Sequence, residues 1–465
     1  MSAHSPFSVK SLQAVHQEAV ARSGGLKPSL GVIDLMAIGI GATVGAGIFV
    51  LSGVAAHEAG PAVVVSFSLA ALACIFTAFA YAEMGAALPV TGSAYAYVYA
   101  SLGEVIAWMV GWNLFLEYAL GASLVASGWS GYMAGVLRDL GVNLPPWCVN
   151  DPSVPGGLIN LPAMLIVLTM ASVVLLGMRE SARVTRCMVA LKLTAVAAVI
   201  IVGATQIEPA NWTPFVPNGW GSVFKAAALV FLAYVGFDVV TSTAAEVRNP
   251  GRDLPRGIIG SLIICTILYA LMSGVLTGMV RYNAIDVKSP ITSAFNAAHL
   301  NFIGGVISAG ALIGMASVLL ALLVGLPRIL LAMARDGLLP AWAAVIHPRT
   351  GTPVATTLAV AIGVSLATAF LPLTALASLC GVGTLTAFSA VCASVAVLRK
   401  REPDLPRPFR FPGPSWTPWI GSLVCLTLLA QILPSIWLQL LIWMASGLAV
   451  YALFGFRNSR IACTP

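Results

Sequence analysis

The chain consists largely of apolar runs about twenty residues long, each bounded by Pro, Gly or charged residues. A helix needs about 20 apolar residues to cross the hydrocarbon core of a bilayer, so runs of this length are candidate membrane spans. Hydrophobic residues make up 59% of the chain and charged residues 9%, whereas soluble domains carry roughly 25% charged residues. The sequence therefore predicts an all-α polytopic membrane protein with no separate water-soluble domain.

The apolar runs number twelve, and we expect twelve transmembrane helices. They lie near residues 30–54, 61–87, 103–134, 160–177, 186–204, 223–247, 257–280, 301–334, 354–371, 373–398, 418–435 and 437–455. The first 29 residues are polar and lack an apolar segment of their own. We expect them to form a tail and not a cleaved signal.

The distribution of Lys and Arg predicts the orientation in the membrane. Nineteen of the 24 cations lie at one set of span ends, Lys192 lies within a span, and the opposite ends carry only Arg138, Lys225, Arg281 and Lys288. Loops rich in Lys and Arg face the cytoplasm. We therefore expect both termini to be cytoplasmic in a cell inner (plasma) membrane.

Several functional classes are disfavoured by the same sequence. The net charge of +7 does not indicate nucleic-acid binding, because basic residues in a polytopic protein are mostly topology signals. No phosphate-binding G-x-x-x-x-G-K-S/T motif is present, which argues against an ATP-driven pump. The five histidines are scattered without ligand spacing, so neither a metal site nor a cofactor is predicted.

The first predicted span contains four glycines, Gly39, Gly41, Gly45 and Gly47, with Thr43 among them. Each glycine costs a helix about 1 kcal/mol relative to alanine, so unwinding is cheap here. Unwound backbone at membrane depth is tolerated only where it faces a cavity. The pattern predicts an interrupted helix, and close helix packing through small residues is the alternative interpretation.

The sixth predicted span has a matching interruption, from Phe231 to Asp238, with Gly236 between them. Spans 1 and 6 begin two blocks of five helices, and interrupted helices at corresponding positions indicate the binding site of an inverted-repeat transporter. Amides freed in span 1 would attract a carboxylate. Carbonyls freed in span 6 would accept hydrogen bonds from an ammonium, and the two poles together match the backbone of an amino acid.

Motifs along the chain resemble the amino acid-polyamine-organocation superfamily, with the closest likeness to the cationic amino acid transporter family in its shorter bacterial form. The motifs are Gly41 to Phe49, Gly60-Pro61, Tyr81 to Glu83, Pro89 to Tyr95, Gly111 to Leu114, Phe237-Asp238, Glu246 to Pro250, Pro327-Arg328 and Arg335 to Leu339. The resemblance runs from about residue 25 to the end of the chain.

This resemblance implies a leucine-transporter-like fold. Residues 30–204 would form one five-helix repeat, residues 205–398 an inverted second repeat, and residues 399–456 a cytoplasmic loop followed by two peripheral helices. Residues 1–29 and 457–465 would be cytoplasmic tails.

Substrate contacts follow from the matching motif positions. The resemblance implies that the substrate carboxylate meets the backbone of Thr43, Gly45, Ala46 and Gly47. The amino group would meet carbonyls around Leu232, Ala233 and Val235. Ile40, Phe231 and Met315 are candidates for lining the side-chain pocket.

Lys192 is an ionisable residue inside the fifth predicted span. One interpretation is that the Lys192 side chain snorkels to the cytoplasmic interface, because Lys192 lies only six residues from Arg186. The resemblance implies a position between spans 1, 5 and 8, where sodium-coupled relatives of this fold bind sodium and proton-coupled ones carry a lysine. A desolvated lysine can exchange a proton near neutral pH. Lys192 is therefore the candidate proton-coupling residue.

Glu117 lies near the middle of the third predicted span. An acid at that depth costs about 2.5 to 3.5 kcal/mol on insertion scales, so it should not face lipid. One interpretation is a neutral or hydrogen-bonded packing residue. The other is a cavity acid that attracts a cationic side chain or relays protons.

Charged residues at the cytoplasmic ends of spans 2, 6 and 8 are expected to form ion pairs or gates. The candidates are Glu83, Glu246 and Arg328. Where animal cationic transporters have two adjacent acids, this chain has Ala245 before Glu246, which weakens a preference for cationic substrates.

The leading hypothesis is a secondary active transporter: proton-coupled symport of small neutral or cationic L-amino acids by alternating access. An exchanger or facilitator without proton coupling, and an amino acid sensor, are the alternatives. No intramembrane nucleophile and base are paired in the sequence, so an enzyme is not predicted. The expected partners are the amino acid, protons and the lipid bilayer; the sequence carries no signal for a small membrane subunit.

Overall fold

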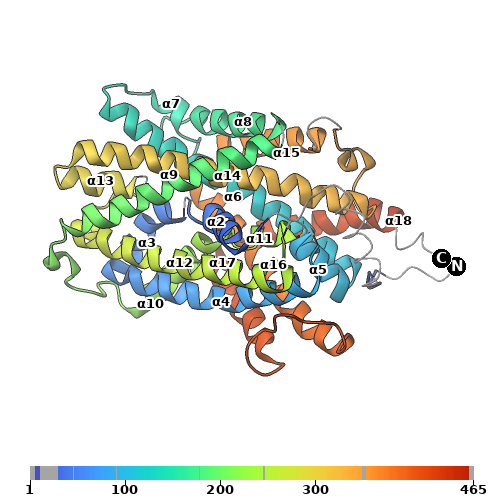
Figure 1. Cartoon of the computed structure of the whole chain (residues 1–465). Helices are drawn as coiled ribbons and strands as arrows, with labels where there is room; N and C mark the ends of the chain where they lie inside the picture. Colours follow the sequence, from blue (N-terminus) through green and yellow to red (C-terminus); the bar gives the residue numbers. More distant parts are fainter. Residues whose placement is uncertain are drawn as a thin grey trace.

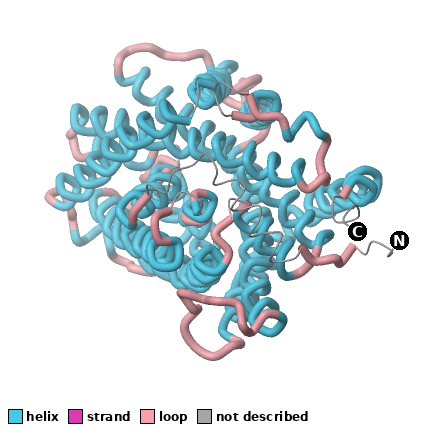
Figure 2. Tube along the Cα trace, turned by 45° about the vertical axis from the view of Figure 1, so that its right-hand side comes forward, coloured by secondary structure: helices cyan, strands magenta, loops and turns pink. Residues whose placement is uncertain are grey.

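The computed structural model describes residues 6–10, 30–45, 47–90, 92–176, 178–244, 247–287, 289–347 and 352–459. Within these ranges the chain is helical, and the only extended pairing is an isolated parallel bridge between Leu30 and Val247. Helices fill the molecule, and the loops lie mostly at its periphery (Figure 2).

The helices of the first half of the chain include three long ones. The helices are α2 (Val32–Thr43), α3 (Ser52–Ala59), α4 (Val63–Ala87), α5 (Ser93–Ser101), α6 (Glu104–Asp139), α7 (Pro146–Val149), α8 (Leu161–Leu176) and α9 (Met178–Ala204). The long ones are α4, α6 and α9. Short turns of 3-10 or π type add η1 (Gly47–Leu51), η2 (Gly60–Ala62) and η3 (Pro209–Trp212).

The second half continues in the same way. Its helices are α10 (Trp220–Val230), α11 (Val239–Ser242), α12 (Pro250–Met279), α13 (Pro290–Ala297), α14 (Asn301–Arg335), α15 (Val354–Phe370), α16 (Leu373–Arg401), α17 (Thr417–Val450) and α18 (Phe456–Asn458). Its short turns are η4 (Phe231–Tyr234), η6 (Tyr282–Ala284), η7 (Ala341–Ala344) and η8 (Tyr451–Gly455).

Eight helical stretches among the described residues are long and apolar enough to cross a membrane. Four shorter apolar helices accompany them: Val32–Thr43, Leu161–Leu176, Val354–Phe370 and Thr417–Gln431. The last of these is part of α17, where non-helical Ile436 (φ −139°, ψ 16°) interrupts the helix. The sequence predicted a boundary between two spans at this same residue. The protein is thus an all-helical membrane protein with many spanning helices.

The long helices run along a common direction, with α5 and α18 at one end of the bundle and α13 at the other (Figure 1). Helix α6 packs against α14 and α16, while α12 packs against α4 and α2. Helix α9 contacts α14 and α12. The turns η1 and η4 touch each other; η1 also contacts α3, α10 and α13, and η4 contacts α4, α10 and α16. Most residues of both turns are buried, so both interrupted segments lie in the interior.

Candidate functional site

The first predicted span is interrupted after Thr43. Helix α2 ends there, Val44 is extended (φ −75°, ψ 97°), and the chain resumes as the π turn η1 followed by α3. The amide of Gly45 makes no backbone hydrogen bond with a described residue. Ala46, a predicted carboxylate contact, lies outside the described residues. Gly45 therefore lies in non-helical backbone inside the predicted glycine run, whereas Gly39 and Gly41 remain within α2 and Gly47 begins η1.

The sixth predicted span is interrupted between η4 and α11. Val235 is extended (φ −61°, ψ 135°) and Gly236 has φ +124°, a conformation that side chains disfavour. The Asp238 carboxylate accepts a hydrogen bond from the Gly236 amide at 3.2 Å, which fixes this turn.

The two interruptions pack directly against each other. A Cβ atom on Gly47 would lie 2.4 Å from the Cα of Ala233, and one on Gly236 would lie 2.7 Å from the carbonyl group of Ala42. Both approaches are closer than any side chain permits. Glycine at these two positions is thus what allows the two backbones to meet.

Tyr269 of α12 joins the two interruptions. Its hydroxyl lies 2.9 Å from the carbonyl oxygen of Thr43 and 2.8 Å from that of Ala233. A hydroxyl has one hydrogen, so these two carbonyls share a single donor. Tyr269 was not predicted, because one tyrosine in an apolar span is also what ordinary core packing contains.

Lys192 of α9 lies against the end of α2. Its side chain is fully buried, and its ammonium donates to the carbonyl oxygen of Gly41, to that of Val44 at 2.9 Å and to the hydroxyl of Ser317 at 3.0 Å. All three N–H groups therefore have acceptors. The ammonium points to α2 and α14 and not to the interface, which contradicts the snorkelling interpretation.

Glu117 lies on α6 in the interior. It is 1% exposed, and neither carboxylate oxygen has a hydrogen-bond partner among the described residues. The next residue, Tyr118, donates to the Asp238 carboxylate at 3.0 Å. Helix α6 thus reaches the second interruption through Tyr118. Asp238 marked that interruption in the sequence, whereas no sequence signal singled out Tyr118.

The remaining predicted substrate contacts are mostly buried. Ile40, Phe231 and Met315 belong to one hydrophobic core and are 6%, 1% and 0% exposed, so the structure is closed around them. The carbonyl oxygen of Leu232 accepts a hydrogen bond from the Val235 amide at 3.2 Å. The side chain of Leu232 lines a separate cavity of about 200 Å³ between α10, α16 and α17. Leu232 therefore contributes its backbone, and not its side chain, to the interruption.

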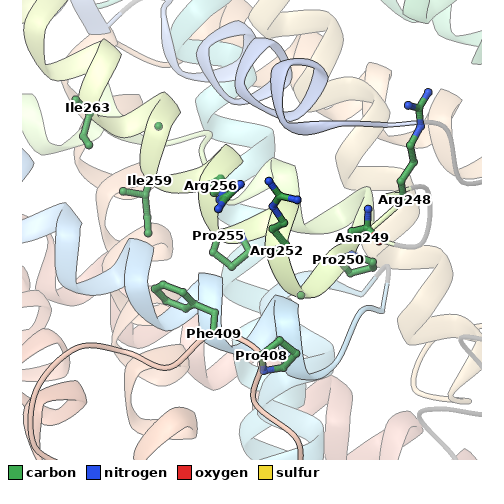
Figure 3. A pocket seen from close by; sticks show the side chains of 12 residues that line it. Arg248, Asn249, Pro250, Arg252, Pro255, Arg256, Ile259, Ile263, Pro408 and Phe409 are labelled. Carbon is green, nitrogen blue, oxygen red and sulfur yellow. The ribbon is translucent and has the colours of Figure 1, made fainter.

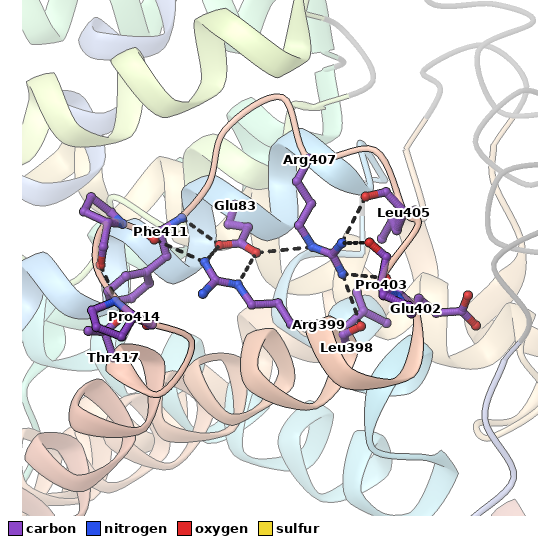
Figure 4. A network of polar contacts seen from close by, with 11 residues as sticks. Glu83, Leu398, Arg399, Glu402, Pro403, Leu405, Arg407, Phe411, Pro414 and Thr417 are labelled. Atoms are coloured by element: carbon purple, nitrogen blue, oxygen red, sulfur yellow. Dashed lines mark hydrogen bonds and ion pairs between the residues drawn. The ribbon is translucent and has the colours of Figure 1, made fainter.

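At the end of the bundle where α4 and α16 terminate, Glu83 forms a buried ion-pair network (Figure 4). Its carboxylate accepts from Arg399 Nε at 2.9 Å, from Arg399 Nη2 at 2.5 Å and from the Phe411 amide at 2.7 Å. Arg407 lies 3.4 Å away. Glu246 lies outside the described residues, and Arg328 is half-buried on α14.

Paired interruptions inside a bundle of membrane helices are characteristic of secondary transporters, whose binding sites lie at such breaks. Comparison with known proteins agrees with this class. The amino acid permease family matches residues 30–456. The chain belongs to this family and is a transporter, not an enzyme.

Three relatives illustrate the range of cargo in similar proteins. The chain is 43% identical to the branched-chain amino acid permease BcaP of Bacillus subtilis over 452 residues, covering 96% of this chain and 97% of the relative. It is 40% identical to the methylthioribose transporter of the same organism, and the match covers 98% of this chain and 99% of the relative. It is 39% identical to the vacuolar cationic amino acid transporter 4 of Arabidopsis thaliana, covering 82% and 64%.

Proposed function

We propose that this protein imports amino acids by alternating access, in symport with protons. The observation that carries the proposal is the direct packing of two interrupted helices. Polar side chains from α9 and α12 reach their freed carbonyls, and one from α6 reaches the Asp238 carboxylate at the second interruption. Non-helical backbone inside a membrane protein is stable only where it is enclosed or serves a site. Here the non-helical backbone is enclosed by polar side chains whose hydrogen bonds can be replaced by bonds to a cargo.

The topology that we propose has twelve spans, with residues 30–204 and 205–398 as inverted repeats and two further helices in residues 399–456. Both tails and the long loop between the last repeat and those helices would be cytoplasmic. The eight long and four shorter apolar helices support twelve spans. The interruptions at 44–45 and 235–238 support the repeat, because they fall in its two corresponding helices.

The amino acid backbone would bind between the interruptions. The amide of Gly45, with Gly47 and the buried hydroxyl of Thr43, which has no partner among the described residues, would meet the carboxylate. Carbonyls of Ala233 and Val235 would meet the ammonium. The carbonyls of Ala233 and Thr43 share the Tyr269 hydroxyl as donor in this structure. As the site opens, Tyr269 would release the Ala233 carbonyl, which could then accept a hydrogen bond from the cargo ammonium.

For the side chain we propose a neutral aliphatic amino acid, such as leucine or valine. Ile40, Phe231 and Met315 are apolar and buried, and an apolar lining favours an apolar side chain. A relative of high identity is a branched-chain amino acid permease. Glu117 supports the cationic alternative, because its carboxylate has no partner among the described residues.

Proton coupling would use Lys192. As an ammonium it holds the carbonyls of Gly41 and Val44 and the hydroxyl of Ser317. Loss of its proton would weaken these bonds, since charged donors bond more strongly than neutral ones. The end of α2, beside the first interruption, could then move. Protonation and opening of the site would be linked in this way.

Methylthioribose is the second candidate cargo, because a relative that the chain covers almost completely is a methylthioribose transporter. This sugar thioether has neither a carboxylate nor an ammonium. It would need only neutral hydrogen bonds from the freed peptide groups.

Uptake into liposomes tests these proposals. Purified protein is reconstituted, and labelled leucine, arginine and methylthioribose are supplied separately, with and without an inward proton gradient and with a protonophore. We expect leucine to accumulate only with the gradient. Equal leucine uptake in all conditions would refute the coupling, and a need for preloaded amino acid would indicate an exchanger. Uptake of methylthioribose without leucine would refute the amino acid proposal, and arginine uptake abolished by Glu117→Gln would identify the cationic cargo.

A further inference from the structure

A basic cavity lies outside the transport site, at the start of α12. It has a volume of about 870 Å³ and is lined by Arg248, Arg252 and Arg256 together with the loop residues Pro408 and Phe409. Figure 3 shows Arg252 and Arg256 side by side on the first turns of the helix, with Arg248 just before it. The lining of the cavity thus has two positive charges side by side, on Arg252 and Arg256, and a third on Arg248 that stands apart from them.

None of these three arginines forms an ion pair with a residue that the structure describes, and all three are exposed. Arg399 and Arg407 behave differently, because both contact the carboxylate of Glu83. Like charges four residues apart on a helix repel each other. The cavity therefore carries uncompensated positive charge, which an anion would neutralise.

An apolar strip continues from the arginines along α12. One face of α12 carries the two arginines and then the apolar residues of the strip, at intervals of three or four residues. They are Arg252 and Arg256, followed by Ile259, Ile263, Ile267 and Leu271. Ile263, Ile267 and Leu271 are 50%, 54% and 49% exposed. From Ile259 to Leu271 the helix rises about 18 Å, close to one leaflet of a hydrocarbon core about 30 Å thick.

The floor of the cavity is fixed by its neighbours. A Cβ atom on Gly251 would lie 2.6 Å from Pro408, so the loop sits directly on the first turn of α12. The ring of Phe409 packs against that of Phe79 on α4, with centroids 6.3 Å apart. The cavity is therefore bounded by parts of the protein that are anchored to two long helices.

We propose that this cavity binds an anionic phospholipid from the cytoplasmic leaflet. The phosphate would lie at Arg252 and Arg256, with Arg248 adding positive charge further along the lining, and an acyl chain would follow the apolar strip. Basic pockets between membrane helices at this depth suit anionic headgroups. A soluble phosphate has the same charge and would use the arginines alone, so the apolar strip distinguishes the two ligands. The proposal is independent of the transported cargo.

Native mass spectrometry of the purified full chain with phosphatidylglycerol tests the arginines. We expect Arg252→Gln/Arg256→Gln to weaken binding by about fivefold for each arginine removed, and Arg252→Lys/Arg256→Lys to retain most of it. The charge-matched control is Arg138→Gln/Arg281→Gln, exposed positions outside the cavity, which should bind as the unmodified protein does. Equal loss in the control, or no loss in the first variant, would overturn the proposal.

A second comparison separates lipid from soluble anion. Ile263→Ser/Ile267→Ser should weaken phosphatidylglycerol binding severalfold, and excess inorganic phosphate should not displace the lipid from the unmodified protein. Phosphatidylcholine, which has no net charge, should bind equally weakly to all variants. Complete displacement by inorganic phosphate, with no effect of the isoleucine changes, would mean that the site takes a soluble anion and would overturn the lipid assignment.

Discussion

The hydroxyl of Tyr269 lies 2.9 Å from the carbonyl oxygen of Thr43 and 2.8 Å from that of Ala233. These carbonyls belong to two different interrupted helices, so one side chain couples the two halves of the proposed binding site. Its single hydrogen is shared between two acceptors. The hydroxyl thus bridges one carbonyl from each interruption, and the Ala233 carbonyl, a proposed acceptor for the cargo ammonium, keeps a second lone pair.

Tyr269→Phe removes this bridge. A hydrogen bond of this kind is worth about 1 kcal/mol, which corresponds to about a fivefold change in an equilibrium. We expect the apparent affinity for the amino acid in liposome uptake to change about fivefold, with the protein still folded. The control is Tyr282→Phe, a tyrosine outside the site on η6. Unchanged kinetics in Tyr269→Phe would remove this residue from the mechanism.

Gly47→Ala should abolish transport by forcing the two interruptions apart. The new Cβ would lie 2.4 Å from the Cα of Ala233, and backbone cannot yield as a flexible side chain can. Overpacking of this kind costs about 1 to 3 kcal/mol. Gly363→Ala on α15 is the matched control, because nothing lies within 4 Å of its Cβ. We expect uptake to fall at least about tenfold in the first variant and to stay normal in the second; equal activity of both would contradict the close packing.

Lys192→Met should uncouple uptake from the proton gradient. The carbonyls of Gly41 and Val44 and the hydroxyl of Ser317 lose their shared donor, and no titratable group replaces it. The measurement is leucine uptake with and without an acidic exterior. Lys225→Met, which alters a lysine 75% exposed at its side chain, should keep the gradient response. Gradient-driven accumulation in Lys192→Met would assign the proton to another residue.

Glu83→Gln should destabilise the protein. Glu83 is 2% exposed at its side chain and contacts Arg399 and Arg407, and breaking a buried pair by removing one charge costs about 3 to 5 kcal/mol. We expect a lower thermal unfolding temperature in detergent. Glu402→Gln, an exposed position, should leave it unchanged. An unaltered unfolding temperature in Glu83→Gln would show that the network contributes nothing to stability.

The fold class and the interruptions were predictable because both leave local traces in the sequence. The length of the apolar runs and the uneven distribution of Lys and Arg between span ends can be taken directly from the order of residues. Four glycines near Thr43 likewise lower helix stability in their own segment, whatever packs against it. The end of an apolar run predicted a boundary between two spans at residue 436, where the structure has a kink within α17.

The partners of the polar groups were not predictable, because they depend on tertiary contacts. Glu83 and Arg399 are 316 residues apart. For Lys192 the family resemblance implied a position between spans 1, 5 and 8, and its acceptors are Gly41 of α2, Val44 just after α2 and Ser317 of α14, which no sequence signal singled out. In the sequence, Tyr118 and Tyr269 cannot be distinguished from tyrosines that pack in an apolar core. In the structure, the hydroxyl of Tyr118 donates to Asp238, and that of Tyr269 lies beside the carbonyls of Thr43 and Ala233. Long-range pairing of this kind leaves no periodic pattern.

The central claim is that both interruptions together bind the cargo. Hydrogen exchange of the purified protein, measured by mass spectrometry with and without a saturating concentration of the transported amino acid, tests it directly. We predict that deuterium uptake falls in peptides covering residues 43–49 and 231–238 and stays constant in a peptide covering residues 354–370. Unchanged exchange at both interruptions under saturation would place the cargo elsewhere and contradict the account.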